Sequence, residues 1–223
     1  MEGFRDFREK IRGKTLDGPV SKYINRKVST RITYLIVKYD IPLTPNMVSL
    51  ISFGIALACL PLYVLGHLIL AGILAQLSSI IDGVDGELAR AKGMASKLGG
   101  FMDTMLDRYA DLAILLGLSI HTLMNYPSTV WAVISVLAVA GDILVSYLHT
   151  RAPYDLGVHP VAIGKAENIA SRDVRLFIVF IGSLLGLTNY TLLVLAVLTH
   201  TYVVLKTIRV INYWQASTQA SYT

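Results

Sequence analysis

Six long apolar segments follow one another along the chain, separated by polar residues. They run roughly over residues 46–66, 68–90, 99–123, 128–149, 173–187 and 190–212. Each is close to the ~20 residues that an α-helix needs to cross the hydrocarbon core of a bilayer. Three connections are very short, at Gly66-His67, from Asn125 to Ser128 and at Thr188-Asn189, and short connections indicate antiparallel neighbours. The pattern therefore predicts an all-α integral membrane protein with six transmembrane helices.

A different pattern precedes the first of these segments. Between Val20 and Tyr39, apolar residues recur at helical spacing while basic residues occupy the other faces. Asp17 fits the N-cap of this helix, with Pro19 in its first turn. We expect an amphipathic helix over residues 17–40 that lies in the membrane interface. The alternative is a core helix of a soluble subdomain, but the sequence shows no other soluble element for it to pack on.

These patterns divide the chain into four parts. A basic N-terminal segment (1–16) precedes the amphipathic helix (17–40), which is followed by a six-helix transmembrane catalytic domain (41–214) and a polar tail (215–223). Only 16% of the 223 residues are charged, and the mean hydropathy is +0.57. Soluble domains carry about 25% charged residues, so the composition supports a membrane protein. We do not expect a cleavable signal peptide, because the first residues are charged and lack an apolar run.

The distribution of Lys and Arg predicts the orientation in the membrane. The three short connections contain neither residue, and every Lys and Arg lies in or next to the opposite face. That face receives the N-terminal region, residues 90–99, residues 150–173 and the C-terminal end. By the positive-inside rule this face is cytoplasmic, so both termini are expected inside the cell membrane.

Four aspartates stand where the second apolar segment ends and the third begins. Asp82 and Asp85 are three residues apart, and Asp103 and Asp107 are four apart, so each pair shares one face of its helix. Two antiparallel neighbours would bring all four carboxylates to one point just inside the cytoplasmic membrane boundary. An unpaired Asp at the centre of a membrane helix costs about 2.5–3.5 kcal/mol on insertion scales, and four together would repel one another.

Four carboxylates at one point need positive charge to offset their repulsion, and divalent cations are its expected source. Carboxylate oxygens suit Mg²⁺, Mn²⁺ or Ca²⁺, and two facing carboxylate pairs suit a two-metal site for phosphoryl displacement. Gly86 and Ala89 leave room for a diphosphate, and Arg90 can neutralise phosphate oxygens. A structural ion-pair network and a cation- or proton-coupled transporter remain alternatives, because both use carboxylates inside membranes. A proton path, however, has no need for the spacing of Gly86, Ala89 and Arg90.

This spacing resembles the signature of the CDP-alcohol phosphotransferase (CDP-alcohol phosphatidyltransferase) family. The matching pattern is Asp82-x2-Asp85-Gly86-x2-Ala89-Arg90-x8-Gly99-x3-Asp103-x3-Asp107. The resemblance extends to the six spans, the interfacial helix and the pair Pro45-Asn46 that opens the first span. It implies that a phospho-alcohol group passes from a CDP-linked donor to the hydroxyl of an acceptor alcohol and that CMP is released.

The resemblance also implies roles for individual residues. Asp107 would be the general base that takes the proton from the acceptor hydroxyl. Two Mg²⁺ or Mn²⁺ ions would bind to Asp82, Asp85, Asp103 and Asp107. The CDP moiety would be bound by Asp82, Gly86, Ala89, Arg90 and Gly99. The expected partners are the donor, the acceptor, the lipid bilayer and a second copy of the chain in a homodimer, with no nucleic acid.

Basic residues outside the signature are candidates for binding an acceptor that carries its own phosphate. They are Arg172, Arg175, Lys165 and Arg151. Arg and Lys pair well with phosphate oxygens. The alternative is that these residues only form the positive-inside belt or bind anionic lipid headgroups. Arg172 and Arg175, three residues apart at the start of the fifth apolar segment, are the better candidates.

The sequence around the signature narrows the resemblance to one branch of the family. The segments DGPVSKYINR, GILAQLSSIIDGVDGELAR, LDRYADLAILLGL and SRDVRLF are similar to archaeal and thermophile di-myo-inositol phosphate phosphate synthases. This branch implies CDP-inositol as donor and inositol 1-phosphate as acceptor. The alternative is a phospholipid synthase that uses CDP-diacylglycerol or CDP-archaeol with a polyol or polyol-phosphate. The branch often carries an upstream cytidylyltransferase domain that this sequence lacks, so the donor is expected from another chain or from a part outside this sequence.

Two further aspartates lie within the predicted spans. Asp111 follows Asp107 by one turn, and we expect it to pair with Arg108; the alternative is that it supports the aspartates of the site. Asp142 is expected to face the helix bundle, because a lipid-facing Asp is costly.

Overall fold

The computed structural model describes residues 3–11, 18–163 and 168–220, and these residues form helices and no strand. The helices are α1 (Phe4–Lys10), the π-helical η1 (Ser21–Asn25), α2 (Arg26–Lys38), α3 (Pro45–Val64), α4 (Leu68–Ala91), α5 (Lys97–Asn125), α6 (Thr129–Leu156), the short 3₁₀ turn η2 (Pro160–Ala162), α7 (Arg172–Leu184) and α8 (Thr188–Ala220). The helices α3 to α8 coincide closely with the six apolar segments of the sequence.

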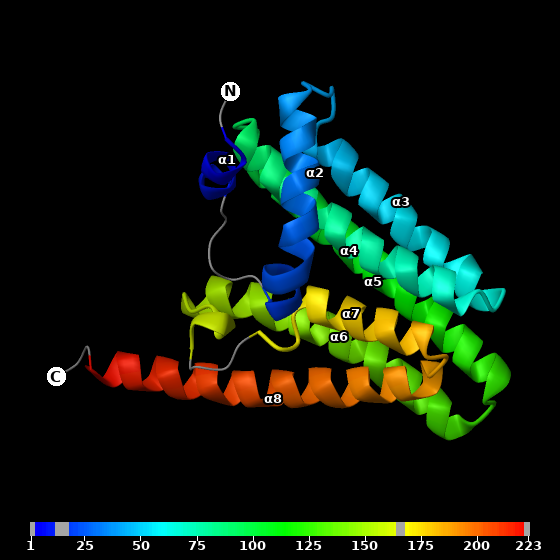
Figure 1. The fold of residues 1–223 in the computed structure, drawn as a ribbon. Coiled ribbons are helices and arrows are strands. Elements are labelled where there is room, and N and C mark those ends of the chain that lie inside the picture. Colours follow the sequence, from blue (N-terminus) through cyan, green and yellow to red (C-terminus); the bar gives the residue numbers. More distant parts are fainter. Residues whose placement is uncertain (1–2, 12–17, 164–167, 221–223) are drawn as a thin grey trace.

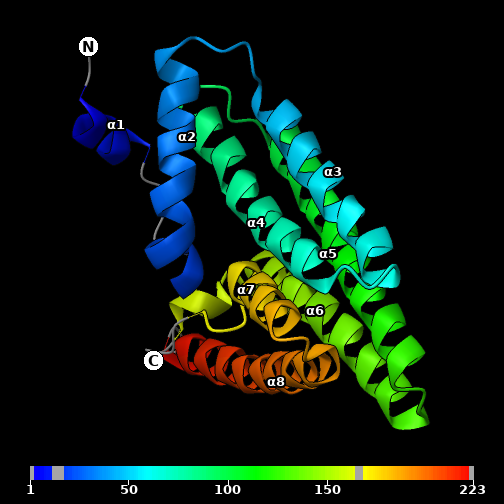
Figure 2. The same cartoon turned by 45° about the vertical axis from the view of Figure 1, so that its right-hand side comes forward.

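These six helices form two groups of three. Helices α4 and α5 both pack on α3, while α8 packs against α6 and α7. The groups meet where α4 contacts α7 and α5 contacts α6. They converge at the end that carries the short turns and diverge toward the end that carries α2 and the C-terminus (Figures 1 and 2).

Local chemistry explains where the helices begin and turn. Thr44 caps α3 by accepting a hydrogen bond from the N–H of Met47 at 3.3 Å, and Pro45 takes the first helical position. The turns between α3 and α4 and between α7 and α8 contain Gly66 (φ +81°) and Gly186 (φ +68°). Residues with a side chain rarely adopt such φ values, so glycine allows these tight reversals.

Four helices are long and apolar enough to cross a membrane within the described part of the chain. They are α3, α4, α6 and α8, the last over Thr188–Ser217. Helix α5 carries several charged residues in its first half, and α7 has only 13 residues. The protein is therefore all-helical and membrane-embedded, with four helices that meet the length and hydropathy of a span.

Small side chains allow close packing within the bundle. The buried core includes Ala56, Ala71, Ala75, Ala110 and Ala138. A Cβ atom built on Gly182 of α7 would lie 1.7 Å from Oγ1 of Thr191 of α8. Such contacts leave no room for a side chain, as is common where membrane helices approach closely.

Helix α2 packs on the outside of α4. Helix α1 packs on α2, and the rings of Phe4 and Phe7 lie 5.4 Å from that of Tyr34. The predicted N-cap Asp17 lies outside the described residues. The N–H of Ser21 instead donates a hydrogen bond to Asp173 of α7 at 2.5 Å, which ties the start of this helical segment to the bundle.

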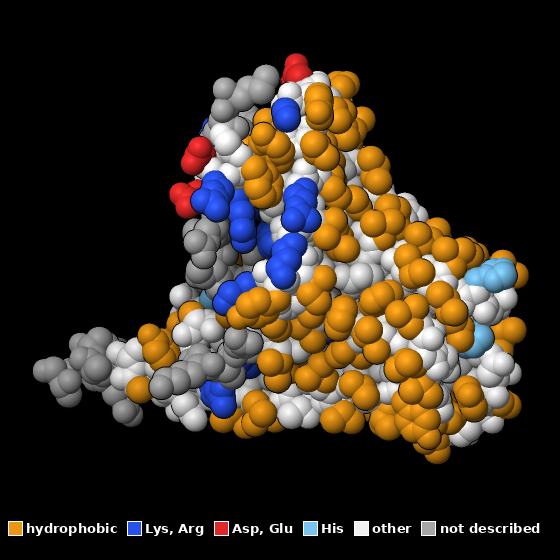
Figure 3. All heavy atoms as spheres, viewed as in Figure 1, with side chains coloured by type: hydrophobic (Ala, Val, Ile, Leu, Met, Phe, Trp, Pro, Cys, Tyr) orange, Lys and Arg blue, Asp and Glu red, His pale blue; other side chains and the backbone are white. Residues whose placement is uncertain are grey.

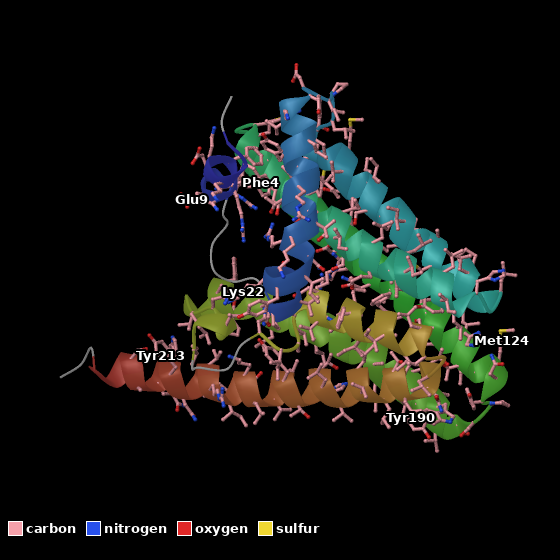
Figure 4. The ribbon with its side chains drawn as sticks, in the orientation of Figure 1. Phe4, Glu9, Lys22, Met124, Tyr190 and Tyr213 are labelled. Atoms are coloured by element: carbon pink, nitrogen blue, oxygen red, sulfur yellow. The ribbon has the colours of Figure 1, made fainter. Side chains whose placement is uncertain are left out.

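Charged and apolar side chains are separated over the surface. On the face shown in Figure 3, Lys and Arg gather over α1 and α2, and hydrophobic side chains cover most of the remaining helices. The exposed basic residues of α1, η1 and α2 are Arg5, Arg8, Lys10, Lys22, Lys27, Arg31 and Lys38. Figure 4 places Lys22 and Tyr213 at the end opposite to Met124 and Tyr190.

Candidate active site

The end of α4 and the start of α5 bring carboxylates together. One carboxylate oxygen from each of Asp82, Asp85 and Asp103 lies within 4.8 Å of the other two. Asp107 joins them through Arg172, whose Nη1 lies 2.9 Å from Oδ2 of Asp82 and 2.9 Å from Oδ1 of Asp107. All four aspartates of the signature therefore border one site.

The connection between α4 and α5 explains this convergence. Gly93 adopts φ +66° just after α4, and Ser96 caps α5 by accepting a hydrogen bond from the N–H of Gly99 at 3.0 Å. A Cβ atom on Gly99 would lie 3.0 Å from Oγ of Ser96 and 3.5 Å from Oδ1 of Asn46. A side chain at this position would therefore crowd the Ser96 cap of α5, while its contact with Asn46 of α3 would be an ordinary one.

Helix α3 contributes a contact that the sequence analysis missed. The hydroxyl of Ser49 donates a hydrogen bond to Oδ2 of Asp85 at 2.5 Å. A small cavity beside this contact is lined by Ser49, Ser52, Phe53, Asp82, Asp103, Leu106, Asp107, Ala110 and Arg172. A signal was available in the sequence, because Asn46 and Ser49 are polar, three residues apart and at the end of an otherwise apolar segment.

Arg172 is the positive group at the centre of the site. Besides its contacts with Asp82 and Asp107, its Nε donates a hydrogen bond to Oδ1 of Asp111 at 2.8 Å. Its Nη2 is buried and has no hydrogen-bond partner among the described residues. The guanidinium therefore binds three carboxylates and keeps one donor group for a further ligand.

Asp111 connects this site to two more arginines. Its Oδ2 lies 3.5 Å from Nη2 of Arg108 and 3.6 Å from Nη2 of Arg175. The expected pair with Arg108 is present, but the shortest contact of Asp111 is with Arg172. Asp111 therefore both pairs with Arg108 and supports the site, because the buried start of α7 places two guanidinium groups beside it.

Asp142 ends the network on α6. Its Oδ1 lies 2.6 Å from Nε of Arg175, and both side chains are buried. Asp142 thus faces the bundle, as expected from the cost of a lipid-facing carboxylate. A chain of ion pairs therefore runs from Asp82 on α4 through α5 and α7 to Asp142 on α6. Each carboxylate in this chain lies within 4 Å of an arginine, which compensates the burial of its charge.

Arg90 and Gly86 lie on one face at the end of α4. A Cβ atom on Gly86 would lie 3.4 Å from Nη1 of Arg90, so the guanidinium lies over the glycine. Nε of Arg90 donates a hydrogen bond to the carbonyl of Ile11 at 2.9 Å. Ala89 is partly buried beside Arg90. The absence of a side chain at Gly86 thus leaves room for the guanidinium of Arg90.

The candidate acceptor residues fall into three groups. Arg172 and Arg175 lie in the charged network described above. Arg151 forms an ion pair with Asp155 on its own helix at 2.8 Å, with 46% of its side chain exposed. Lys165 lies outside the described residues. The site therefore brings together Arg172 and Arg175 but not Arg151.

The carboxylates fit a divalent cation. Three carboxylate oxygens lie within 4.8 Å of one another, and Oδ1 of Asp103 is buried without a hydrogen-bond partner among the described residues. Burial of such a group is unfavourable unless a hydrogen bond or a cation compensates it. Carboxylate oxygens are the ligands that Mg²⁺ and Mn²⁺ prefer.

Comparison with known proteins agrees with this site. The family model described as CDP-alcohol phosphatidyltransferase matches residues 42–214. The chain is 45% identical over 137 residues to a "Bifunctional IPC transferase and DIPP synthase" of Thermococcus kodakarensis, covering 61% of this chain and 30% of the relative. It is 36% identical over 157 residues to the "Archaetidylinositol phosphate synthase" of Pyrococcus horikoshii, covering 70% of this chain and 78% of the relative.

Solved structures show the same fold. The phosphatidylinositol phosphate synthase of Mycobacterium tuberculosis "with CDP-DAG bound" superposes with a TM-score of 0.69 at 21% identity, covering 82% of this chain and 94% of that chain. The same enzyme in complex with manganese and citrate gives a TM-score of 0.66 and covers 82% and 88%. The chain spans between 30% and 43% of the length of the first three curated relatives. With a family model that matches most of its length, the chain belongs to the CDP-alcohol phosphatidyltransferase family.

Proposed function

We propose that this member of the family transfers a phospho-alcohol group from a CDP-linked donor to the hydroxyl of an acceptor alcohol and releases CMP. The observation that carries the proposal is the convergence of Asp82, Asp85, Asp103 and Asp107 on one partly buried site beside Arg172. Substrate phosphates are anionic, so a site of this kind needs both carboxylates for cations and an arginine for phosphate oxygens.

Asp107 is proposed as the general base. It accepts the proton of the acceptor hydroxyl while the hydroxyl oxygen forms a bond to the β-phosphorus of the donor. The bond between the β-phosphorus and the bridging oxygen breaks, and this oxygen leaves with its electron pair as part of CMP. Arg172 holds Asp107 in place through the contact of 2.9 Å. A base must first be in position and only then have a suitable proton affinity.

The remaining signature residues are proposed to bind the donor and the cations. Asp82, Gly86, Ala89, Arg90 and Gly99 would bind the CDP moiety. Two Mg²⁺ or Mn²⁺ ions, held by Asp82, Asp85, Asp103 and Asp107, would supply positive charge that stabilises the charge developing on the diphosphate. Gly86 leaves room for the guanidinium of Arg90, which is placed to reach phosphate oxygens.

The proposed acceptor carries its own phosphate. Arg172 supports this, because its Nη2 is a buried donor without a partner among the described residues and lies at the cavity. Arg175, Lys165 and Arg151 are proposed to add positive charge around it. Arg175 is already bound to Asp111 and Asp142, so it acts mainly by holding the network around Arg172.

The proposed substrates are CDP-inositol and inositol 1-phosphate, which would give di-inositol phosphate phosphate. The name of the Thermococcus relative supports this choice. The alternative is a phospholipid synthase with CDP-diacylglycerol or CDP-archaeol as donor and a polyol or polyol-phosphate as acceptor. The Pyrococcus relative, of which the chain covers 78%, favours that alternative.

The proposed topology has six spans, with α2 in the interface and the active site and both termini in the cytoplasm. The division into residues 1–16, 17–40, 41–214 and 215–223 is part of this proposal. Four apolar helices and the basic residues over α1 and α2 support it. A homodimer is also proposed, on the resemblance to the family.

Release of CMP by purified protein tests the proposed function. CDP-inositol, CDP-diacylglycerol and CDP-archaeol would each be offered with Mg²⁺ and with inositol, inositol 1-phosphate or glycerol phosphate. We expect CMP and a matching phosphodiester product from at least one pair, identified by mass spectrometry. Reactions without acceptor control for hydrolysis of the donor. If no pair yields CMP, the transferase proposal is wrong, and cation flux across vesicles would then test the transporter alternative.

A further inference from the structure

Glu87 carries a buried carboxylate that the proposed mechanism does not use. It lies on α4 directly after Gly86, and the residue is 1% exposed. Its hydrogen bonds go to α2 and not to the aspartates of the cavity. Burial of a carboxylate is unfavourable unless it is paired and hydrogen-bonded, so its partners reveal what it holds.

Four side chains of α2 converge on this carboxylate. Oε1 accepts hydrogen bonds from Nη1 of Arg26 at 2.7 Å, Oγ of Ser29 at 2.9 Å and Oγ1 of Thr30 at 3.1 Å. Oε2 accepts one from Oγ1 of Thr33 at 2.7 Å. The four donors lie on one side of α2 over about two helical turns. Both oxygens of Glu87 are therefore satisfied by a single helix.

These contacts fix α2 in one orientation. The polar side of α2 faces α4, whereas Val28 and Leu35 remain exposed on its other sides. An apolar contact would tolerate a small slide or rotation of α2, because hydrophobic packing is not directional. The hydrogen bonds to Glu87 would not tolerate such a movement, because each requires its donor at a fixed position along α2 and in a fixed direction around it.

The position of α2 is coupled to the proposed nucleotide site by two paths. Nη1 of Arg26, bound to Glu87, also lies 3.5 Å from the carbonyl of Gly83, the residue after Asp82. Helix α1 packs on Tyr34 of α2 through Phe7, and the carbonyl of Ile11, just after α1, accepts the hydrogen bond from Arg90. A displacement of α2 would thus move groups at both ends of the proposed CDP site.

We propose that Glu87 is a positioning residue for the nucleotide donor, which locks α2 onto α4 and thereby holds Arg90 and the backbone around Gly86 in the geometry that binds CDP. This inference rests on the proposed function, because it concerns the same nucleotide site. Glu87 itself touches neither the donor nor the cations. Its effect is transmitted through α2 and α1.

Binding of CDP to the full chain in detergent, with Mg²⁺ present, tests this role by titration calorimetry. Glu87→Gln keeps the shape of the side chain but removes its charge and gives it an amide that faces hydroxyl and guanidinium donors. We expect the Kd for CDP to rise about tenfold, as is common when a supporting residue of a site is lost. The donor KM should rise by a similar factor, with little change in kcat, because Asp107 and its contacts are untouched.

Gln76→Leu is the matched control. Gln76 lies on α4, six residues before Asp82, and donates a hydrogen bond at 2.8 Å to Asn25, the last residue of η1 directly before α2. We expect this variant to lose thermal stability but to bind CDP as the wild type does. Equal losses of CDP affinity in Glu87→Gln and Gln76→Leu would show that general packing is responsible, and the positioning role would be wrong.

Thr33→Val provides a milder variant in case Glu87→Gln does not fold. It removes the partner of Oε2 and leaves the ion pair with Arg26, so a rise in the CDP Kd of about threefold is expected. If Glu87→Gln and Thr33→Val fold and bind CDP with wild-type affinity, the positioning role of Glu87 is wrong, and the proposed function is unaffected. Failure of the wild type itself to bind CDP would instead overturn the proposed function, and the positioning role with it.

Discussion

Nη1 of Arg172 lies 2.9 Å from Oδ1 of Asp107, the residue proposed as general base. The same nitrogen lies 2.9 Å from Oδ2 of Asp82, so one N–H-bearing group joins the two carboxylate pairs. Inside a membrane protein such a contact is both strong and directional. Arg172 thus links the proposed base, a proposed cation ligand and the proposed acceptor pocket, and several measurements can separate these roles.

Replacement of Arg172 by Lys should weaken acceptor binding more than donor binding. Lys keeps the charge but cannot contact several carboxylates and a phosphate at once. We expect the acceptor KM to rise about tenfold or more, because hydrogen bonds to charged groups contribute about 1.5–3 kcal/mol. Steady-state kinetics with each substrate varied in turn would measure it. Arg151→Ala, which breaks an exposed ion pair, should change the acceptor KM less. Equal effects of the two variants would indicate that both arginines act only as part of the positive-inside belt.

Asp107→Asn should abolish turnover and leave CDP binding largely intact. The amide cannot accept the proton of the acceptor hydroxyl, and general base catalysis contributes about 10²–10⁴-fold. We expect CMP release to fall at least 100-fold in a discontinuous assay, with the CDP Kd within about threefold of the wild type. Substantial residual activity in this variant would exclude Asp107 as the base.

Ser49→Ala should weaken cation binding through Asp85. The hydroxyl of Ser49 orients this carboxylate, and loss of such a partner typically lowers metal affinity about 10–100-fold. Titration with Mn²⁺, followed by electron paramagnetic resonance without substrates, measures the effect directly. Ser52→Ala is the control, because Ser52 lines the same cavity but donates its hydrogen bond to the carbonyl of Ser78. An unchanged Mn²⁺ affinity in Ser49→Ala would mean that Asp85 needs no support from α3.

Two methionines at opposite ends of α4 and α5 test the proposed orientation. Met124 lies near the end of α5, and Met94 lies in the turn after α4, and both are well exposed. In intact cells, a membrane-impermeant thiol reagent should label Met124→Cys, and it should label Met94→Cys only after permeabilisation. Cys59 is fully buried and should give little background. The reverse labelling pattern would place the aspartates outside.

Gly182→Ala should destabilise the packing of α7 on α8. The added methyl group would overlap with Thr191, and overpacking of this kind typically costs about 1–3 kcal/mol. A methyl group added at Gly54 in α3 would meet no neighbouring atom within 4 Å, so Gly54→Ala should cause no loss of stability. Thermal unfolding in one detergent compares the two variants. Equal melting temperatures would show that α7 and α8 separate readily at this point.

Local patterns in the sequence were sufficient for the helices and for the aspartate site. Helical spacing places Asp82 with Asp85 and Asp103 with Asp107, and a short connection brings the end of α4 and the start of α5 to the same site. The sequence also predicted that these two helices pack side by side, whereas both pack on α3. The contacts of Asp111 could not be derived in this way. Arg172 is 61 residues away from Asp111, and only the packing of α7 against the bundle brings the two together.

The role of α2 shows a second limit of sequence patterns. Periodicity identifies an amphipathic helix but does not say which side faces the protein. Ser29, Thr30 and Thr33 are small and polar, and in isolation they indicate a face toward water. Glu87 reverses this reading, because a buried carboxylate on α4 requires hydrogen-bond donors from its neighbour. A single acidic residue 54 positions after Thr33 thus decides the orientation of the helix.

The length of α7 has a consequence for how substrates arrive. Its 13 residues rise about 20 Å, whereas the hydrocarbon core of a bilayer is about 30 Å thick. In the proposed topology the far end of α7, near Gly186, lies at the outer boundary, so its start, where Arg172 meets the carboxylates, would lie about 10 Å short of the cytoplasmic boundary. The proposed active site would then lie below the level of the headgroups. In that case a donor with acyl chains would reach it laterally from within its leaflet, whereas a water-soluble inositol phosphate would have to reach it from the cytoplasm.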